Sequence, residues 1–362
     1  QTENFIFTNA LVNASEKAAC IARRIRKDVA LLSLLVQEKS SEESNPRFVR
    51  DFKTLADVLI QETIRHDVGV KFPEIRDSIK GEETATFTNI LGDSVTVTIG
   101  KNVEQTTACL NVVLNGNTLA ADILAHEAHR EVNFCSSEVP SFPDDFDYSQ
   151  LGIWIDPIDA TAEYIAGDTI FSSFPGITST GLDCVTVLIG VYDKRNGAPI
   201  LGVINQPFHQ RVDVCSYSSE LFWAVSIGGK WHNNSQSVGA PQTRKIGLFS
   251  SSEASDVMER VKTLDYEVGF TAGAGHKALK VITGEADLYL LTKGSTFKWD
   301  TCAPQAILQS IGGGMFDFRE SLKQGKAVPI SYNVEEEKCN SGGVIALRNP
   351  DLLEDILKIF KD

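Results

Sequence analysis

The 362-residue sequence has no run of about 18 apolar residues, and this absence argues against a membrane span. It also has no excess of basic residues, because 34 Lys and Arg stand against 48 Asp and Glu, a formal charge of −14. Nucleic-acid binding needs clustered cations that displace counterions from phosphates, so this charge argues against it. No internal repeat or low-complexity block is present, and we expect a globular chain with a large core.

The cysteines show no pattern of a disulfide framework. There are seven, an odd number, and none forms a Cys-x-x-Cys pair. Scattered cysteines of this kind are typical of reduced thiols in the cytosol. Residues 1–14 also lack a basic segment followed by an apolar block and a small-residue cleavage site. These features predict a cytoplasmic protein.

Hydrophobic periodicity predicts an α/β protein. Apolar residues at helical spacing predict a helix from Leu11 to Val36, and a second helix is predicted over Asp51–Ile64. Two hairpins are predicted with turns at Asn196-Gly197 and at Gly228-Gly229.

The order of predicted elements changes at about residue 240, after which short apolar runs that predict strands alternate with segments that predict helices. We therefore expect two parts: an α+β part over residues 1–240 and an α/β part over residues 241–362.

The most informative segment runs from Trp154 to Thr161 and reads WIDPIDAT. It predicts an apolar strand that delivers Asp156 and Asp159 at its exit, with a helix beginning near Thr161. Pro157 disfavours helix at Asp156 and fixes the turn. Carboxylates at such a turn can bind hard cations, and the N–H groups of the helix start can hold a phosphate.

Other acidic residues have a similar placement. Glu82 and Glu83 follow a short predicted strand, and Asp300 stands at the head of an apolar helix. Each also has a simpler interpretation, since paired glutamates in a loop are usually solvated and an Asp at a helix start is as often an N-cap. Asp57 lies in a predicted helix, where a carboxylate is most often a surface charge. A cation site therefore depends on their combination with WIDPIDAT.

Two segments resemble known zinc-binding and dinucleotide-binding motifs, but both motifs are incomplete. His126 and His129 lack the spacing of the zinc motif H-E-x-x-H, and we expect both on a helix surface. Gly273, Ala274 and Gly275 form only a fragment of G-x-G-x-x-G, so no dinucleotide site is predicted. We expect instead a turn at a helix N-terminus that is suited to an anion.

Three motifs follow one another along the chain: GEE at 81–83, WIDPIDAT at 154–161 and KWDTCAPQAIL at 298–308. Together they resemble the three signatures of the lithium-sensitive, magnesium-dependent sugar and inositol phosphatases. The likeness spans nearly the full length, since SEKAACIAR, DFKTLADVLIQE, GVINQPF and GAGHK also match. The resemblance implies a layered α/β sandwich, similar to inositol monophosphatase and fructose-1,6-bisphosphatase, with mixed sheets between helix layers.

The resemblance also implies the cofactor and its ligands. Two or three Mg²⁺ ions would be held by Glu82, Glu83, Asp156, the carbonyl of Ile158, Asp159 and Asp300. Asp57 and Thr161 would form a hydrogen-bonded pair that, together with Glu82, orients and deprotonates the attacking water. Hard, hydrated Mg²⁺ prefers such oxygen ligands, so the residue types fit.

The implied substrate contacts are Asp159, Ala160, Thr161, Ser252, Gly273, Ala274, Lys277 and Ser295. In this set the N–H groups of Ala160 and Thr161 would hold the phosphate that is removed, and Lys277 would reach a second phosphate. The chain departs from the family at two positions. Ala160 replaces the usual glycine or serine, and a lysine that relatives carry near Ala254 is missing.

The implied reaction removes the 1-phosphate from inositol 1,4-bisphosphate and inositol 1,3,4-trisphosphate, and Li⁺ should inhibit it. The implied partners are small-molecule inositol phosphates, with no nucleic acid and no membrane, and the family expectation is a monomer. An alternative is a 3′(2′),5′-bisphosphate nucleotidase, since residues 299–304 (WDTCAP) and 162–164 (AEY) resemble that branch. A third hypothesis is a catalytically silent homologue that binds inositol phosphates.

Overall fold

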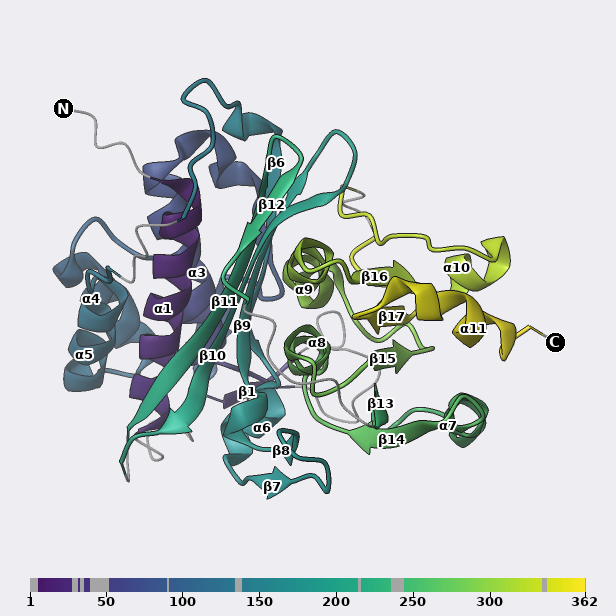
Figure 1. Cartoon of the computed structure of the whole chain (residues 1–362). Helices are drawn as coiled ribbons and strands as arrows, with labels where there is room; N and C mark the ends of the chain where they lie inside the picture. Colours follow the sequence, from purple (N-terminus) through teal and green to yellow (C-terminus); the bar gives the residue numbers. More distant parts are fainter. Residues whose placement is uncertain are drawn as a thin grey trace.

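A computed structural model describes residues 6–27, 32, 36–39, 52–89, 91–133, 139–213, 216–235, 244–333 and 337–361. Its elements form alternating layers (Figure 1). One group of helices covers the outer face of a six-stranded sheet, α8 and α9 lie between this sheet and a five-stranded sheet, and a last group of helices covers the far side. This arrangement confirms the predicted α/β layered sandwich.

The outer helices are α1 (Phe7–Arg26), α3 (Leu55–Lys71), α4 (Val103–Val113) and α5 (Thr118–Ala128). The apolar positions of α1 that predicted a helix are buried, and Arg23, Arg24 and Arg26 occupy its last turn, where cations favour a helix end. The predicted extension of this helix to Val36 is wrong, because Val36 begins strand β1 (Val36–Glu38).

A short antiparallel pair replaces parts of both predicted helices. In this pair β1 lies against β2 (Phe52–Thr54), with Val36 opposite Thr54. The second helix therefore begins at Leu55 rather than at Asp51, which lies outside the described residues. Thr54 is in the extended region and caps α3, so a local capping signal and a strand partner outweigh the apolar spacing.

The six-stranded sheet has the order β12-β11-β10-β9-β6-β3. Its strands are β3 (Ile79–Gly81), β6 (Leu151–Asp159), β9 (Thr186–Asp193), β10 (Pro199–Arg211), β11 (Tyr217–Ile227) and β12 (Lys230–Asn233). The predicted hairpins are confirmed, and Gly228 and Gly229 both have the positive φ that a tight turn between β11 and β12 requires.

The five-stranded sheet has the order β14-β13-β15-β17-β16. Its strands are β13 (Lys245–Phe249), β14 (Tyr266–Phe270), β15 (Leu288–Leu291), β16 (Gly314–Asp317) and β17 (Val344–Leu347). The helices that accompany it are α7 (Ser255–Lys262), α8 (Ala274–Thr283), α9 (Lys298–Ser310), α10 (Phe318–Gln324) and α11 (Leu353–Lys358). All strands of the six-stranded sheet precede residue 240 in sequence, and all strands of the five-stranded sheet follow it. The division of the chain into two parts at that point stays a prediction.

Smaller elements complete the described chain. They are α6 (Thr161–Ala166) and the strand pairs β4 (Thr86–Thr88) with β5 (Ser94–Thr96) and β7 (Ile170–Phe171) with β8 (Thr178–Thr180). Short 3₁₀ segments span Pro73–Ser78, Tyr148–Gln150, Leu182–Cys184 and Pro350–Leu352.

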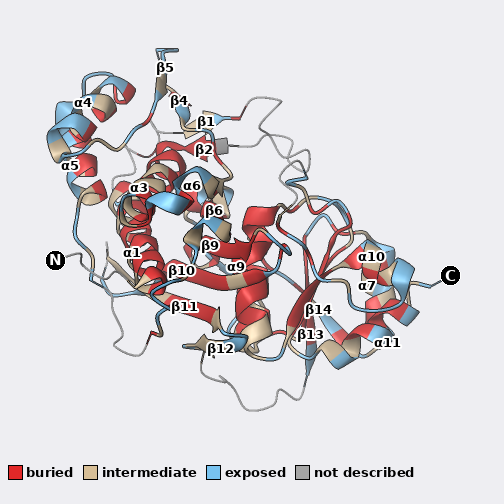
Figure 2. Ribbon diagram, turned by 90° about the horizontal axis from the view of Figure 1, so that it is seen from above, coloured by how far each residue is buried: buried red, intermediate tan, exposed pale blue. Residues whose placement is uncertain are grey.

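Helix α9 is the central element of the molecule and is buried along most of its length (Figure 2). It lies against β9 and β10 where Gly190 and Gly202 are cross-strand partners. A Cβ at Gly202 would come within 2.3 Å of the Ala303 carbonyl oxygen, and one at Gly190 within 2.5 Å of the Ala303 nitrogen. The two glycines therefore let the backbone of α9 approach the sheet closely.

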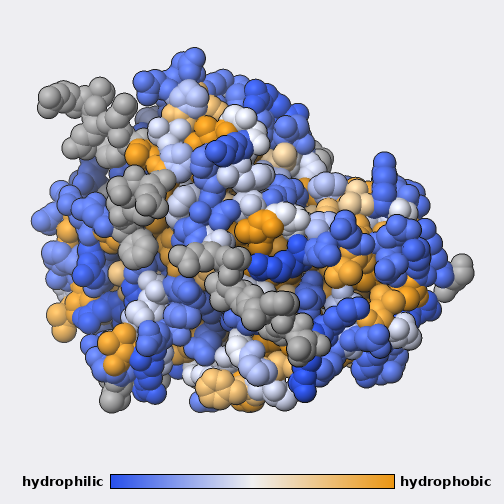
Figure 3. Space-filling view, in the orientation of Figure 1, coloured by the Kyte–Doolittle hydropathy of each residue, from blue (hydrophilic) through white to orange (hydrophobic). Residues whose placement is uncertain are grey.

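The surface and the cysteines bear on the sequence-based expectations for membrane spans and disulfide bonds. Hydrophilic residues cover most of the face shown in Figure 3, and apolar residues occur there in separate patches. No helix in the described part of the chain is long and apolar enough to cross a membrane. The five described cysteines have free thiols, and Cys135 and Cys215 lie outside the described residues.

Candidate active site

The parallel pairing of β3 with β6 places the first two acidic motifs side by side. Gly81, the last residue of β3, lies opposite Ile155, and the N–H of Glu82 donates to the Ile155 carbonyl at 3.1 Å. Glu82 therefore leaves its strand next to Asp156. Two acidic residues that are 74 positions apart in sequence meet here because parallel strands end at the same edge of a sheet.

A β-bulge brings Asp156 and Asp159 to the same side of the chain. Residues three apart in a regular strand point to opposite faces. In the pairing with β9, however, Asp156 lies opposite Leu188 and Asp159 opposite Thr186, so one extra residue is accommodated between them. Pro157 stands within the bulge, where the N–H that it lacks is not needed by the ladder.

Asp300 arrives from the other direction, in the first turn of α9. Its Oδ2 accepts a 2.6 Å hydrogen bond from the N–H of Phe297. The N-cap interpretation of Asp300 is therefore wrong, because Phe297 is the N-cap and Asp300 is the third residue of the helix. The same side chain reaches the strand carboxylates. Ligand atoms of Asp156, Asp159 and Asp300 all lie within 4.8 Å of one another.

Ionisation of this three-carboxylate cluster is disfavoured by burial and by repulsion among its members. Burial, with the charges of Glu82 and Asp159, raises the pKa of Asp156 well above its ordinary value. Burial and the Asp159 charge do the same to the pKa of Asp300. Asp156 Oδ1 is buried and has no hydrogen-bond partner. Because a buried carboxylate oxygen without a partner is costly, and because the three carboxyl groups repel one another when ionised, this set fits a bound cation that would supply positive charge.

The N-terminus of α8 holds Asp159 in place. Its carboxylate accepts hydrogen bonds from the N–H groups of Ala274 at 3.1 Å and Gly275 at 2.9 Å, and from the Thr186 hydroxyl at 3.2 Å. Gly273 has a positive φ of 77°, and a Cβ there would lie 2.7 Å from Asp159 Oδ2. The glycine-rich turn that the sequence assigned to an anion therefore binds an anionic group of the protein itself.

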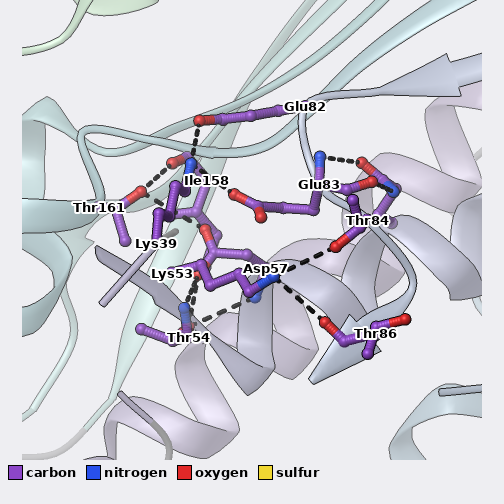
Figure 4. Close-up of polar contacts among 11 residues, drawn as sticks. Lys39, Lys53, Thr54, Asp57, Glu82, Glu83, Thr84, Thr86, Ile158 and Thr161 are labelled. Carbon is purple, nitrogen blue, oxygen red and sulfur yellow. Dashed lines mark hydrogen bonds and ion pairs between the residues drawn. The ribbon is translucent and has the colours of Figure 1, made fainter. Parts of the chain in front are cut away.

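Asp57 is completely buried at the third position of α3 (Figure 4). Its Oδ2 accepts hydrogen bonds from the N–H and the hydroxyl of Thr54, each at 2.6 Å. The Thr161 hydroxyl lies 3.5 Å from Asp57 Oδ1 and 3.0 Å from the Ile158 carbonyl oxygen. Burial raises the pKa of Asp57 to about 6, although the Thr54 bond lowers it. Asp57 and Thr161 are thus neighbours, as the resemblance implied.

Glu82 and Glu83 share an ammonium group that was not among the expected site residues (Figure 4). Lys39 Nζ lies 2.6 Å from Glu82 Oε1 and 2.8 Å from Glu83 Oε1. Burial and the Glu82 charge nevertheless raise the pKa of Glu83 to about 8. The backbone of Glu83 is held by Gln61, whose side chain accepts from its N–H at 2.9 Å and donates to its carbonyl at 2.6 Å.

A cavity of about 340 Å³ opens over these groups. Its lining includes most of the expected residues, namely Glu82, Asp156, Ile158, Asp159, Ala160, Thr161, Gly273, Ala274, Ser295 and Asp300. Asp57 and Glu83 lie behind the wall. Ala160 has a left-handed backbone (φ 69°) before α6, a conformation that alanine adopts only where the surroundings impose it.

Two expected substrate contacts lie outside this lining. Lys277 is 1% exposed, and its Nζ donates to the Thr271 carbonyl at 3.0 Å. Ser252 lies beside the lining residue Ser251, and its hydroxyl is 3.0 Å from that of Ser250. Neither histidine of HEAH is among the lining residues of this pocket. His129 Nε2 lies 2.8 Å from the hydroxyl oxygen of Thr106 on α4.

Four further residues hold the carboxylates in place, and of these only Thr54 has a recognisable sequence pattern; the others are Lys39, Gln61 and Thr186. A Ser or Thr three residues before an acidic residue is a capping-box pattern, and Thr54 with Asp57 fits it. Nothing in the local sequence indicates that Gln61 faces Glu83 or that Thr186 faces Asp159, because both contacts depend on tertiary pairing.

The fold and the site together define a class: an α/β sandwich whose acidic motifs converge on a pocket at the junction of its sheets. The model of the inositol monophosphatase family matches residues 8–361, and the chain belongs to this family. It is therefore an enzyme of the phosphatase class.

Known relatives agree with this assignment. The chain is 40% identical to inositol polyphosphate 1-phosphatase of Bos taurus, over 96% of this chain and 95% of that protein. It is 32% identical to 3′(2′),5′-bisphosphate nucleotidase 1 of Rattus norvegicus, over 55% of this chain and 58% of that protein. Its fold is similar to that of an IMPase/NADP phosphatase complexed with Mg²⁺ and phosphate, with a TM-score of 0.51, 14% identity, and coverage of 93% of this chain and 90% of that one.

Proposed function

We propose that this phosphatase is a Mg²⁺-dependent phosphomonoesterase that removes the 1-phosphate of inositol 1,4-bisphosphate and inositol 1,3,4-trisphosphate, and that Li⁺ inhibits it. The observation that carries the proposal is the cluster of Asp156, Asp159 and Asp300, whose ligand atoms lie within 4.8 Å of one another at a pocket. The choice of substrate is supported by the 40% identity to an inositol polyphosphate 1-phosphatase.

The residues divide into two ligand groups around Asp156. Glu82, Asp156 and the Ile158 carbonyl would hold one ion, with Glu83 beside them, and Asp156, Asp159 and Asp300 would hold a second. When bound, the ions supply Lewis-acid stabilisation of phosphoryl oxygens and lower the pKa of water. Li⁺ is also a small hard cation, and we expect it to compete for these oxygens.

The chain's own groups would handle the proton of the attacking water. Thr161 Oγ1 can accept a hydrogen bond from that water while donating to Asp57 Oδ1. With a pKa of about 6, Asp57 is ionised at neutral pH and acts as the acceptor. The Thr54 hydroxyl holds the other oxygen of Asp57, so the carboxylate keeps its orientation.

The proposed ligands are small-molecule inositol phosphates, taken by a cytoplasmic monomer that binds neither nucleic acid nor membranes. The second candidate is a 3′(2′),5′-bisphosphate nucleotidase. Phe270, which is 40% exposed, and Phe297 both line the pocket, and an aromatic face suits a nucleobase. The inositol phosphate assignment is preferred because the inositol phosphatase relative matches 96% of the chain, against 55% for the nucleotidase.

The test is phosphate release from inositol 1,4-bisphosphate and from 3′-phosphoadenosine 5′-phosphate in parallel, with and without Mg²⁺ and Li⁺. We expect Mg²⁺-dependent, Li⁺-sensitive release with a preference for the inositol substrate. A preference for the nucleotide would overturn the substrate assignment, and no release from either would indicate a silent homologue.

The variant that tests the ligand role is Asp300→Asn, which keeps the hydrogen bond from the N–H of Phe297 and removes the negative charge. Since even indirect partners of a metal site are worth about 10–100-fold, we expect this variant to lose more than about a hundredfold in turnover while remaining folded. Unchanged turnover would refute the ligand role of Asp300.

A further inference from the structure

The described lining of the active-site pocket contains no lysine and no arginine. Its charged residues are all acidic: Glu82, Asp156, Asp159, Glu163 and Asp300. Bound metal ions would neutralise part of this charge around the phosphate that is removed. A substrate with a second phosphate, which follows if the proposed function is correct, needs a cation elsewhere on the rim.

Two lysines near the pocket are held by protein carbonyls behind its wall. Lys277 is buried and donates to the Thr271 carbonyl. Lys298 is buried and donates to the Ser331 carbonyl at 2.6 Å. A third, Lys39, is paired with the carboxylates of Glu82 and Glu83.

Lys293 is different, because it is exposed and contacts the loop that follows β13, which contributes Ser251 to the pocket lining. Its Nζ donates a hydrogen bond to the Ser252 carbonyl. Ser252 follows the lining residue Ser251, and Lys293 precedes the lining residue Ser295 by two positions. The loop of residues 250–254 itself contains no cation, so the ammonium group against it comes from the neighbouring loop.

A buried carboxylate fixes these two loops to each other. Glu253, in the first loop, accepts hydrogen bonds from the N–H and the hydroxyl of Thr292, at 2.8 and 2.9 Å. Thr292 directly precedes Lys293. The N–H of Ser295 donates to the Lys293 carbonyl at 3.0 Å and closes the turn. Lys293 is therefore carried on a turn that is anchored next to Ser251 and Ser252.

We propose that Lys293, with the hydroxyl groups of Ser251 and Ser295, binds the phosphate that the enzyme does not remove. A lysine ammonium is a compact charge on a flexible stem, and it can turn from the Ser252 carbonyl to an anion at the rim. The lining residues nearest to Lys293 along the two loops, Ser251 and Ser295, contribute hydroxyl groups, whereas β6 and α9 contribute carboxylates to the lining. Lys293 is thus a specificity-determining residue for substrates with more than one phosphate.

The test compares Lys293→Gln with the wild type in three measurements. We expect the KM for inositol 1,4-bisphosphate and the inhibition constant of inositol 4-phosphate each to rise about tenfold, since hydrogen bonds between charged groups are worth about that factor. We expect kcat to change by less than about twofold. The inhibition constant of inorganic phosphate, which needs only the metal-side subsite, should not change.

Two further variants sharpen the result. Lys293→Arg keeps the cation and should restore most of the affinity. Lys262→Gln removes the same charge from the opposite end of α7, where its partner is Glu259, and should behave as the wild type.

The outcomes separate this inference from the proposed function. If the wild type releases no phosphate from the bisphosphate with Mg²⁺, the proposed function fails and the role of Lys293 fails with it. If the wild type is active and Lys293→Gln keeps its KM, or weakens inorganic phosphate equally, the proposed function stands and the role of Lys293 is refuted.

Discussion

At the scale of single residues, the site depends on groups that hold the carboxylates as well as on the carboxylates themselves. Gln61 is completely buried, and its amide makes two hydrogen bonds to the backbone of Glu83. Gly81 is needed beside it, because a Cβ there would lie 2.0 Å from Gln61 Oε1. Gln61 thus fixes the turn from which Glu82 and Glu83 extend.

Replacing Gln61 with Glu should weaken metal binding. The new carboxylate cannot donate to the Glu83 carbonyl, and it adds negative charge next to an acidic cluster. We expect the Mg²⁺ concentration for half-maximal activity to rise about tenfold or more, as is typical for residues that orient metal ligands. A titration of phosphate release against Mg²⁺ measures this shift.

Gln105→Glu is the matched control. The Gln105 side chain accepts from the N–H of Lys101 at the surface, and a carboxylate accepts equally well, so its Mg²⁺ titration should be that of the wild type. An unchanged titration for Gln61→Glu would show that Gln61 has no positioning role.

The sequence predicted the carboxylates but not the residues around them. WIDPIDAT carries its own strand and turn signals, so Asp156 and Asp159 could be assigned from local pattern. The side chains of Lys39, Gln61 and Thr186 contact Glu82, Glu83 and Asp159 from other elements. Their residue types are ordinary in their own segments, and only the tertiary pairing gives them a role.

At the scale of elements, the position of Asp300 depends on how closely α9 lies on its sheet. Gly202 and Gly190 form a cross-strand pair under Ala303, three residues after Asp300. A side chain at this point must push against helix backbone, which cannot move aside as a side-chain tip can.

We expect Gly202→Ala to shift α9 outward, because its Cβ would lie 2.3 Å from the Ala303 carbonyl oxygen. Overpacking of this kind costs about 1–3 kcal/mol of unfolding free energy. The shift should also move Asp300 and raise the Mg²⁺ requirement. Denaturant unfolding and the Mg²⁺ titration check the two effects.

Gly247→Ala serves as the control for a strand glycine. Its Cβ would meet only side-chain atoms, of Phe249 and Leu288, at 3.1 Å or more. We expect a smaller loss of stability and no change in the Mg²⁺ requirement. If the two substitutions raised the Mg²⁺ requirement equally, the close packing of α9 on the sheet would not be what positions Asp300.

The elements that were predicted incorrectly failed for one reason. The apolar spacing from Leu11 to Val36 fits a helix, yet Val36 pairs with Thr54 in a strand. A short apolar segment is compatible with either a helix or a strand, and it forms a strand where a neighbouring strand is available to pair with it. The bulge between Asp156 and Asp159 was likewise invisible in the sequence, since it is a feature of the pairing between β6 and β9.

At the scale of the whole molecule, the acidic residues are brought together from the six-stranded sheet, from α9 and from the outer helix α3. Their charges are buried at the junction, and the chain as a whole has a formal charge of −14. The folded protein without metal therefore retains protons on groups that would be ionised in the unfolded chain. Metal binding and folding are coupled through these protons.

The sign of the resulting pH dependence follows from two carboxyls. The pKa of Asp57 is about 6 in the fold against an ordinary value of 3.8, and that of Glu83 is about 8 against 4.5. Between the ordinary and the folded values, the native state binds more protons than the unfolded state. Stability therefore falls as pH rises through this window, the reverse of the usual behaviour of a salt-bridged carboxylate.

We expect the protein in EDTA to lose on the order of 1–3 kcal/mol of stability between pH 6 and pH 8, which is several degrees in Tm. Mg²⁺ binds the folded state, and more tightly as the carboxyls ionise, so it should abolish most of this loss. Glu83→Gln removes the carboxyl group whose pKa is raised to about 8 and should flatten the EDTA profile over the same range. A Tm in EDTA that is constant or rises from pH 6 to pH 8 would mean that the buried cluster is already neutralised within the protein, and the case for a cation there would lose its electrostatic basis.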